Sequence, residues 1–379
     1  MIIYVDDILS IHDLPRMELE KLGMYYRLKD DSIEEPVQYL GADVRKWKSQ
    51  YENGNDVDCY ALGCNTYLKR AIENVERMMD KNDLKYPSTR RHGSSTTFSS
   101  ASYRPELDST EFCDANHTSI FQNLIGILRW LCELGRLDVL HETSLLSQYL
   151  VAPRLGHLDQ ALNIFKYMKN NLKKWLVFDP CMFEIIWTPQ KDEPHPKERA
   201  LTMKKLYPDV DIAMPDNAPK PLGNPVQLTA FVDADHAGNK VTRRSHTGIF
   251  VMANLAPIAW YSKKQNTVET STFGSEIVAL KTVTEMLQGI IYKLIMLGVP
   301  IDGPANILCD NDSVVKNTTF PESPLNKKHC AVAYHKVRET VAAGLTLIYY
   351  ERSESNLADL FTKVMPANKR HVLIEAMMS

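Results

Sequence analysis

Four acidic residues stand at points of the sequence from which a sheet and its helices can bring them together. Asp233 follows the run 226–232, in which apolar and polar side chains alternate as in a strand. Glu276 falls in the first turn of an expected helix, Asp310 ends a further apolar strand, and Asp359 opens the last expected helix. Hard oxygen ligands on a rigid support are what Mg²⁺ prefers, so these positions predict a metal site.

The chemistry of such a cluster follows from its charge. Four carboxylates in one place repel one another unless cations lie between them. Two Mg²⁺ ions about 3.5–4 Å apart would relieve the repulsion and form a centre that cleaves phosphodiesters, one ion activating a water and the other stabilising the leaving oxygen. Taken singly, each acid also has an ordinary interpretation, as a residue of a turn, a cap or a helix N-terminus.

The elements expected around these acids form a mixed α/β layered domain with five strands. An antiparallel meander of three strands comes first, followed by a long helix, and then a strand, a helix, a strand and a last helix. The expected bounds are 226–232, 247–252 and 257–262 for the meander, 272–297 for the long helix, 306–310 and 345–350 for the later strands, and 332–344 and 357 onward for the later helices.

The N-terminal half carries a second pair of acids. Residues 1–11 read as two apolar strands joined by a tight turn, with Asp6 and Asp7 at the tip. Adjacent acids at a hairpin tip are usually a solvated turn, but apolar flanks on both sides favour a buried hairpin that presents them into a cleft. Helical periodicity over 121–149 and 158–168 indicates a small helical domain.

Composition sets broader limits. The length of 379 residues indicates more than one domain, and the net charge of −3 shows no overall basic character of the kind that nucleic-acid-binding proteins often have. The seven scattered cysteines fit no paired framework, which favours reduced thiols. Without an 18-residue apolar run or a signal-peptide pattern, the chain is expected inside the cell, in a cytoplasmic particle or the nucleus, and not secreted.

Local basic residues are the remaining candidates for holding a nucleic-acid backbone. Arg243, Arg244, Lys263 and Lys264 are expected on loops between the strands of the meander. Solubilising surface charge explains them equally well.

The motifs around the four acids resemble the RNase H domain of Ty/copia-type retrotransposon Pol polyproteins, in the family's order across about 228–366. The resemblance implies an RNase H-like fold and makes Asp233, Glu276, Asp310 and Asp359 the catalytic ligands of Mg²⁺, with Mn²⁺ as a substitute. The matching stretches are Val232-Asp-Ala-Asp-His-Ala-Gly238, Arg243-Arg-Ser-His-Thr-Gly248, Trp260-Tyr-Ser-Lys-Lys-Gln265, Ser275-Glu-Ile-Val-Ala-Leu280, Cys309-Asp-Asn311, Lys328-His329, Tyr334-His335 and Ala358-Asp-Leu-Phe-Thr-Lys363.

The N-terminal half resembles the reverse transcriptase part of the same polyprotein. Tyr4-Val-Asp-Asp7 is similar to the polymerase hairpin and Tyr39-Leu-Gly41 to the segment after it. Stretches 121–126 and 161–168 are similar to the helical thumb and connection. The resemblance makes Asp6 and Asp7 polymerase metal ligands. The fingers, most of the palm and the upstream Asp of that site are missing, so we expect no polymerase activity from this chain alone.

Together, composition and resemblance give an expected domain order. It is a partial reverse transcriptase palm at 1–50, the start of the thumb at 51–85, a Ser/Thr-rich linker at 86–118, a helical thumb/connection at 119–188, a Pro-rich linker at 189–225, an RNase H-like domain at 226–366 and a C-terminal tail at 367–379.

Two departures from the family pattern bear on rate and folding. His236 stands where the family has Trp, and Gly274-Ser-Glu-Ile277 replaces Glu-Ala-Glu-Tyr. The roles of His236, His329 and His335 stay open.

The expected function is cleavage of the RNA strand of RNA–DNA hybrids by an RNase H endonuclease within a Pol fragment, with other Pol or Gag products as candidate partners and no membrane. The alternative is a catalytically decayed remnant that at most binds nucleic acid. An integrase-like nuclease would use fewer acids in a different spacing, and the stretch 358–363 argues against it.

Overall fold

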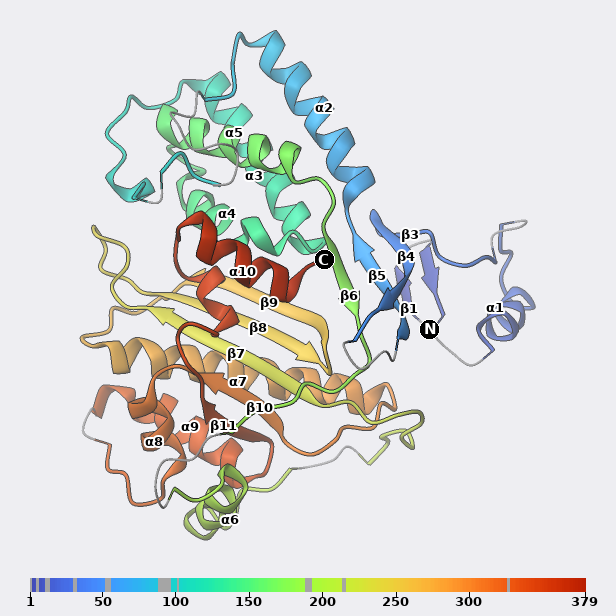
Figure 1. The fold of residues 1–379 in the computed structure, drawn as a ribbon, viewed down its shortest axis with the longest axis vertical. Helices are drawn as coiled ribbons and strands as arrows, with labels where there is room; N and C mark the ends of the chain where they lie inside the picture. The colour runs from blue at the N-terminus through green and yellow to red at the C-terminus, as the bar shows by residue number, and fades with distance from the viewer. Residues whose placement is uncertain are drawn as a thin grey trace.

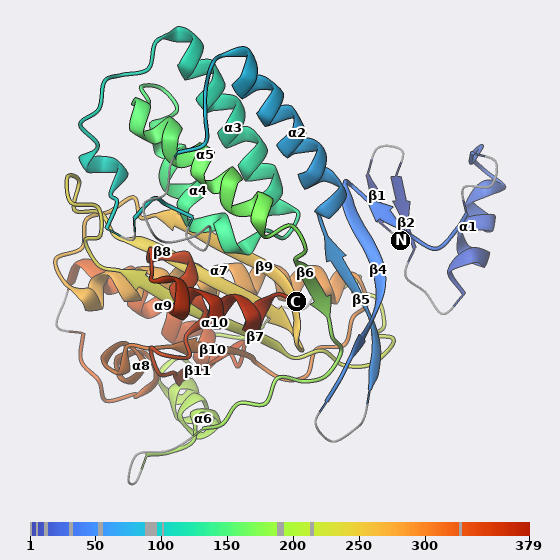
Figure 2. The same ribbon diagram turned by 45° about the horizontal axis from the view of Figure 1, so that its top comes forward.

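The computed structural model shows a helical half lying over a five-stranded sheet, with a narrow four-stranded sheet beside them (Figures 1 and 2). No helix in the described ranges is both long enough and apolar enough to cross a membrane. The structure describes residues 2–4, 7–10, 14–29, 33–51, 56–87, 97–100, 102–187, 193–212, 216–325 and 328–379.

The five-stranded sheet has the order β11-β10-β7-β8-β9. Strands β7 (Leu228–Asp235), β8 (His246–Ala253) and β9 (Ala256–Lys264) form the predicted antiparallel meander. Strand β10 (Ala305–Cys309) runs parallel to both β7 and β11 (Thr346–Tyr350). The expected mixed five-stranded α/β fold is therefore confirmed.

The two faces of this sheet have different covers, because side chains alternate along each strand. Leu228, Ala230 and Val232 of β7 face a core built with helices α7, α8 and α9. Phe231 of β7 and Phe250 of β8 face the other side, under the 3₁₀-helix η5 and helix α10. These covering elements are α7 (Thr272–Met296), α8 (Asp312–Thr319), α9 (Ala331–Ala342), η5 (Leu357–Phe361) and α10 (Ala367–Met377).

One helix lies where composition predicted only a linker. Helix α6 (Pro196–Leu206) falls within the proline-rich range 189–225. Its first residue is proline, which fits the first helical position because that position needs no backbone N–H. Met203 is fully buried, and the buried Arg199 donates to Thr319 Oγ1 at 2.9 Å. The prediction of a linker over 189–225 was therefore wrong for the residues of α6, which pack against the rest of the C-terminal half.

The helical half is built around a core of its own. Helices α2 (Asn65–Lys81), α3 (Ala115–Glu133), α4 (Leu140–Leu146) and α5 (Leu155–Asn170) bury one continuous apolar cluster. The helical periodicity over 121–149 and 158–168 predicted the last three of them. The shorter helices are α1 (Pro15–Gly23), η1 (Pro105–Leu107), η2 (Leu137–Val139), η3 (Ser147–Tyr149) and η4 (Lys328–Cys330).

The narrow sheet has the order β3-β4-β5-β6. Strands β3 (Gln38–Tyr39) and β4 (Ala42–Ser49) pair antiparallel on either side of Gly41. The pairing of β5 (Val57–Gly63) with β6 (Trp175–Phe178) was not predicted.

At the N-terminus, β1 (Ile2–Tyr4) and β2 (Asp7–Leu9) pair antiparallel, as expected for the hairpin. Asp6 lies outside the described residues, and only the backbone of Asp7 is described.

Buried charges join the two halves of the molecule. The Arg136 guanidinium donates to both oxygens of Asp138, at 2.9 and 2.7 Å, and both side chains of this pair are excluded from solvent. Tyr167 donates to Asp138 at 3.0 Å, and Arg370 of α10 donates to the Asp138 backbone carbonyl. Since Arg370 also stacks 4.6 Å from the Tyr167 ring, α10 is fixed to the helical half.

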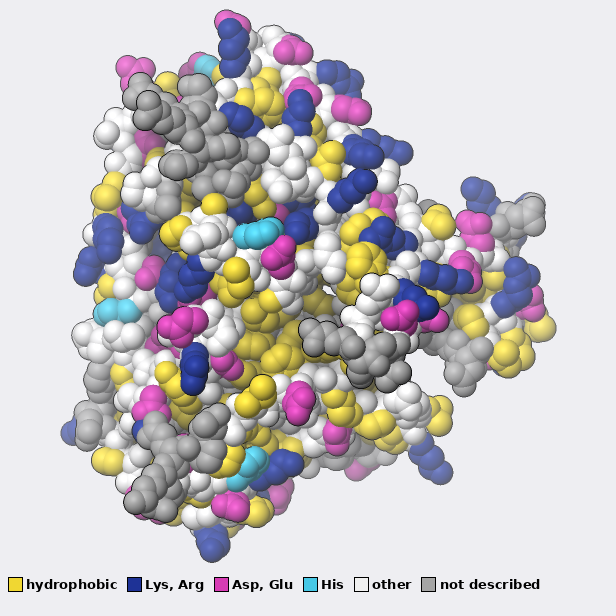
Figure 3. Space-filling model, viewed as in Figure 1, with side chains coloured by type: hydrophobic (Ala, Val, Ile, Leu, Met, Phe, Trp, Pro, Cys, Tyr) yellow, Lys and Arg dark blue, Asp and Glu magenta, His cyan; other side chains and the backbone are white. Residues whose placement is uncertain are grey.

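The same junction includes shared apolar packing. Leu137 and Leu176 lie in one cluster with Phe231 and Phe250 of the five-stranded sheet. Figure 3 shows hydrophobic side chains gathered in a hollow at the centre of this face. A cavity of about 690 Å³ there is lined by residues of the narrow sheet and of the C-terminal half, among them Trp47, Val177, Phe231, Phe250 and Met378.

We expect Asp138→Asn to lower the free energy of unfolding of the whole chain by about 3–5 kcal/mol, because it leaves the buried Arg136 charge uncompensated. Urea unfolding measures this. Asp211→Asn is the control: Asp211 pairs with Lys204 in solvent, 83% exposed, and its loss should cost at most about 1 kcal/mol. Equal costs for the two variants would contradict the structural importance of the buried pair.

Candidate active site

The four predicted acids meet beside the carboxyl ends of β7 and β10. Carboxylate oxygens of Asp233, Asp310 and Asp359 lie within 4.8 Å of one another. A second group, again within 4.8 Å, joins Glu276 and Asp310 with the thiol of Cys309. Asp310 belongs to both groups, so the structure gathers all four carboxylates at one site.

Asp233 is presented by the sheet and Asp359 by the segment that covers it. Strand β7 continues two residues beyond Asp233, so this acid lies inside the strand, opposite Gly248 of β8. A Cβ at Gly248 would lie 2.7 Å from both the Ala358 carbonyl oxygen and Thr362 Cγ2. Only glycine lets η5 approach the sheet this closely, and that approach brings Asp359 to Asp233.

The expected helix start at Asp359 was wrong. Asp359 lies in the five-residue 3₁₀-helix η5, and helix α10 begins only at Ala367. Asn356 caps η5 by accepting from Ala358 N at 3.0 Å, and its amide donates to the Val232 carbonyl at 3.0 Å. The position of Asp359 is thus set by a side-chain bridge to β7.

Glu276 lies near the start of α7, which covers the face of the five-stranded sheet opposite η5. Ser271 caps this helix by accepting from Gly274 N at 3.2 Å. The Glu276 carboxylate accepts from the Ala234 backbone, but its Oε2 has no hydrogen-bond partner among the described residues. Burial, followed by the charges of Asp233 and Asp310, raises the pKa of Glu276 well above its ordinary value.

Asp310 is the solvent-facing member of the set. It follows β10 directly and is only partly buried, whereas Asp233 and Asp359 are each 1% exposed. Ser353 donates to Asp310 Oδ2 at 2.8 Å.

Two lysines neutralise the site from the η5 side. Lys363 Nζ lies 2.6 Å from Asp359 Oδ1 and 3.1 Å from Asp233 Oδ2, so one ammonium bridges the two buried acids. Lys369 Nζ lies 2.7 Å from Asp359 Oδ2. Neither lysine was assigned a role from the sequence, although Lys363 closes the motif that contains Asp359, four residues later.

The pKa of Asp233 is raised to about 6 by burial, which outweighs the opposing effect of the Lys363 charge. The nearby Asp359 carboxylate raises the pKa further, and a hydrogen bond from Thr362 opposes that rise. Asp233 therefore exchanges its proton near neutral pH in the absence of a metal.

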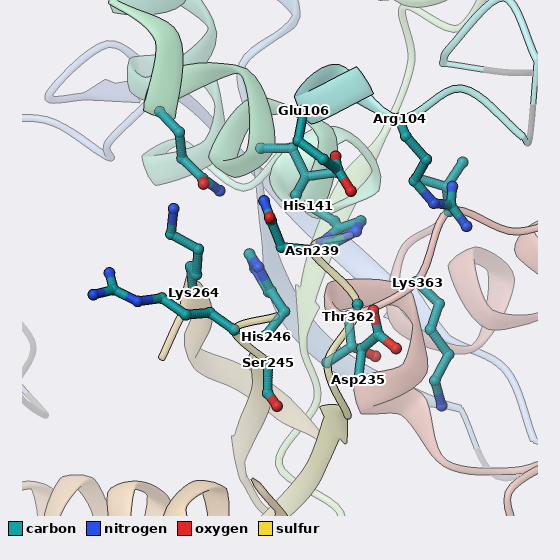
Figure 4. Close-up of a pocket in the computed structure, with 15 residues that line it drawn as sticks. Arg104, Glu106, His141, Asp235, Asn239, Ser245, His246, Lys264, Thr362 and Lys363 are labelled. Atoms are coloured by element: carbon teal, nitrogen blue, oxygen red, sulfur yellow. The ribbon is translucent and has the colours of Figure 1, made fainter. Parts of the chain in front are cut away.

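A polar cavity of about 290 Å³ is lined in part by Thr362 and Lys363 (Figure 4). It adjoins the acids through these residues, because Thr362 contacts Asp233 and Lys363 contacts both Asp233 and Asp359. Arg244 and Lys264 line it, together with Lys363 and with Arg104, which precedes η1 in the helical half. Glu106, Asp235 and the buried His141 and His246 rings complete much of its wall. Arg104 was missed because it lies in the Ser/Thr-rich segment that was expected to be a linker.

Of the four basic residues predicted to hold a nucleic-acid backbone, Arg244 and Lys264 line this cavity. Arg243 and Lys263 are not among the described residues that line the cavity. The expectation that all four lie on loops was wrong for Lys263 and Lys264, which belong to β9.

The three histidines left open have local partners. His236 Nδ1 lies 3.3 Å from Ser275 Oγ, and His335 Nδ1 lies 2.7 Å from the Tyr207 hydroxyl. His329 lies 3.3 Å from Glu269.

Comparison with known proteins gives relatives of one kind. The retrovirus-related Pol polyprotein from transposon RE1 of Arabidopsis thaliana is 25% identical over 366 residues, which are 96% of this chain and 20% of that protein. The transposon TyH3 Gag-Pol polyprotein of Saccharomyces cerevisiae is 24% identical over 92% of this chain and 17% of its own length. The chain spans about a fifth of the length of these curated relatives. No protein-family model matches it.

Solved structures similar to part of the chain include two RNases H. RNase H1 from Halobacterium salinarum is 16% identical with a TM-score of 0.29, covering 36% of this chain and 94% of that one. LC11-RNase H1 in complex with an RNA/DNA hybrid is 15% identical with a TM-score of 0.29 and the same coverage.

These sequence relatives are Pol polyproteins of retroelements. More narrowly, the homologues over most of the chain are Pol polyproteins of the Ty1/copia type, which confirms the resemblance stated from the motifs.

The raised pKa of Asp233 predicts how metal-free stability depends on pH. The folded chain holds a proton at pH values where the unfolded chain has released it. The protonated Asp233 carboxyl therefore adds to the free energy of unfolding. This stabilisation is full below pH 3.8 and is lost as pH rises through about 6. We expect the wild-type chain in chelator to lose up to about 3 kcal/mol relative to Asp233→Asn across this window, measured by urea unfolding at each pH. A constant difference would show that the pKa is not raised.

Proposed function

We propose that the C-terminal part of this chain is a metal-dependent RNase H that cleaves the RNA strand of RNA–DNA hybrids. The observation that carries the proposal is the convergence of Asp233, Glu276, Asp310 and Asp359 from four separate elements into one site. Buried carboxylates repel one another, so their convergence needs cations. The similarity to Pol polyproteins over 96% of the chain supports the same reaction class.

The donor set fits divalent magnesium. All four side chains offer carboxylate oxygens, and Glu276 Oε2 is buried without a hydrogen-bond partner in the described structure. A buried carboxylate oxygen without a hydrogen-bond partner, on a side chain whose pKa is raised by burial and by the charges of Asp233 and Asp310, is what a cation site leaves when no ion is present. When bound, two Mg²⁺ ions would supply activation of the attacking water and stabilisation of the leaving oxygen.

The protein's own side chains have separate tasks in this proposal. Asp233 and Asp359 are rigid, buried ligands, while Asp310 bridges the two donor groups at the solvent side, where a phosphodiester can approach. Lys363 holds Asp233 and Asp359 together as a counter-cation. Deprotonated Asp233 and Glu276 are required as ligands, so their raised pKa values link activity to neutral or higher pH.

The adjoining cavity is the proposed place of the nucleic-acid backbone. Arg244 and Lys264 line it from the side of the five-stranded sheet and Arg104 from the helical half, so cations of both halves border one space. Figure 4 shows Lys264 and Arg104 on opposite sides of the view. Contacts of this kind position a duplex without reading its sequence. An A-like hybrid would be recognised by backbone shape and 2′-hydroxyl groups.

A polymerase function is not proposed for this chain alone. The two acids that the resemblance assigns to it, Asp6 and Asp7, have no described side chains from which a site can be built.

The decisive experiment is cleavage of a labelled RNA–DNA hybrid by the full chain in Mg²⁺, compared with Asp310→Asn. We expect cutting of the RNA strand only, lost by a factor of about 10² or more in the variant, because Asp310 joins both donor groups. Asp310 is partly exposed, so the substitution should leave the fold intact, which circular dichroism checks. Asp312→Asn, two residues later in α8, is the matched control and should keep activity.

Absence of cutting by a folded, Mg²⁺-saturated chain would favour the alternative of a decayed remnant that at most binds nucleic acid. Cutting that persists in Asp310→Asn would mean that another site or a contaminant is responsible.

The cavity residues predict salt-dependent binding. The double variant Arg244→Gln/Lys264→Gln should weaken hybrid binding in chelator and reduce the slope of log affinity against log salt by about 1 for each phosphate contact removed. Fluorescence anisotropy over a salt series measures both. Lys205→Gln, an exposed lysine on α6, is the control. An unchanged slope in the double variant would assign Arg244 and Lys264 to surface charge alone.

A further inference from the structure

A second group of metal-binding side chains lies where α7 and α9 begin, and it shares no residue with the carboxylate site. Glu269 precedes α7, His329 belongs to η4, and Cys330 is the residue before α9. One carboxylate oxygen, one ring nitrogen and the sulfur lie within 4.8 Å of one another. The cysteine is not in a disulfide.

The donor spacing matches ligands around a single zinc ion. Zinc binds nitrogen and oxygen at about 2.0–2.2 Å and sulfur at about 2.3 Å, and at tetrahedral angles this puts nitrogen and oxygen about 3.3 Å apart and sulfur and oxygen about 3.5 Å apart. In the structure, His329 Nε2 and Cys330 Sγ lie 3.3 and 3.9 Å from the same atom, Glu269 Oε2. Small movements would complete the coordination.

The carboxylate is held in place for this contact. Thr267 donates to Glu269 Oε1 at 3.0 Å, which leaves Oε2 directed at His329 and Cys330. A Cβ at position 274 would lie 2.7 Å from Oε2. Gly274, one of the two departures from the family pattern, therefore provides the space that the Glu269 carboxylate occupies.

We propose that Glu269, His329 and Cys330 bind one Zn²⁺, with solvent as the fourth ligand on the side of the half-exposed His329. Binding releases the thiol proton to solvent and forms a Zn–S bond. The ion ties the segment before α7 to the segment before α9. A thiolate–imidazole–carboxylate set favours Zn²⁺, whereas the four carboxylates of the other site favour Mg²⁺, so the two sites are expected to select different ions.

This proposal does not depend on nuclease activity, and its test measures binding. The full chain is stripped with chelator and titrated with Zn²⁺ in millimolar Mg²⁺, which keeps the carboxylate site occupied. We expect one tightly bound Zn²⁺ per chain. With Co²⁺ as the probe, a thiolate-to-metal charge-transfer band should appear in the near ultraviolet.

Three variants test the ligands. Cys330→Ser should abolish the Co²⁺ band, and Glu269→Gln and His329→Gln should each weaken Zn²⁺ binding at least about tenfold. The His329 side chain is 50% exposed, so this variant should fold even if Cys330→Ser does not. Gly274→Ala should weaken binding without removing a donor. Cys113→Ser, a partly buried thiol outside every cluster of metal donors in the described structure, should change nothing.

Two results would overturn the proposal. One is a folded chain that binds no Zn²⁺ under these conditions. The other is Zn²⁺ binding that survives His329→Gln and Cys330→Ser but is lost in Cys309→Ser or Asp310→Asn, which would place the ion in the carboxylate site.

Discussion

The mutual repulsion of Asp233, Glu276, Asp310 and Asp359 is the constraint around which the C-terminal half is arranged. Burying like charges together is unfavourable unless positive charge is close. The chain supplies Lys363 and Lys369 from the η5 side, while Glu276 stays protonated more readily because its pKa is raised. The mixed sheet then provides rigid supports, since parallel β7 and β10 end at the same edge.

The close approach of η5 depends in turn on what lies behind it. Gly248 leaves room for the Ala358 carbonyl, and Ser262 donates to the Phe361 carbonyl at 2.7 Å. Phe361, the last residue of η5, joins the apolar cluster that includes Leu137 of the helical half. Asp359 is therefore held between the sheet and a cover that packs against both halves of the molecule. The geometry of the acids is a property of the whole chain.

The sequence predicts features that depend on neighbouring residues, but not contacts between residues that are far apart in the chain. Alternation along β7 and an acid after an apolar strand are enough to find Asp233 and Asp310, because strand periodicity and chain order fix where their side chains go. Lys363 could not be assigned, since its bridge to Asp233 spans 130 residues. Arg104 and Lys264 line the same cavity only because the two halves are in contact. Helix α6 was not predicted because the sequence alone does not distinguish a proline that starts a helix, as Pro196 does, from one that breaks a helix.

The contact between Arg370 and Asp138 can form only late in synthesis of the chain. The two residues are 232 positions apart in the chain. At synthesis rates of about 5–20 residues per second, Arg370 emerges roughly 10–50 s after Asp138. During that interval the helical half lacks the cation that lies beside Asp138 and Glu142, and the apolar cluster around Leu137 lacks its later members. The helical half is thus completed only after α10 has been made, and nascent chains held just short of residue 370 should be more sensitive to protease there than released ones.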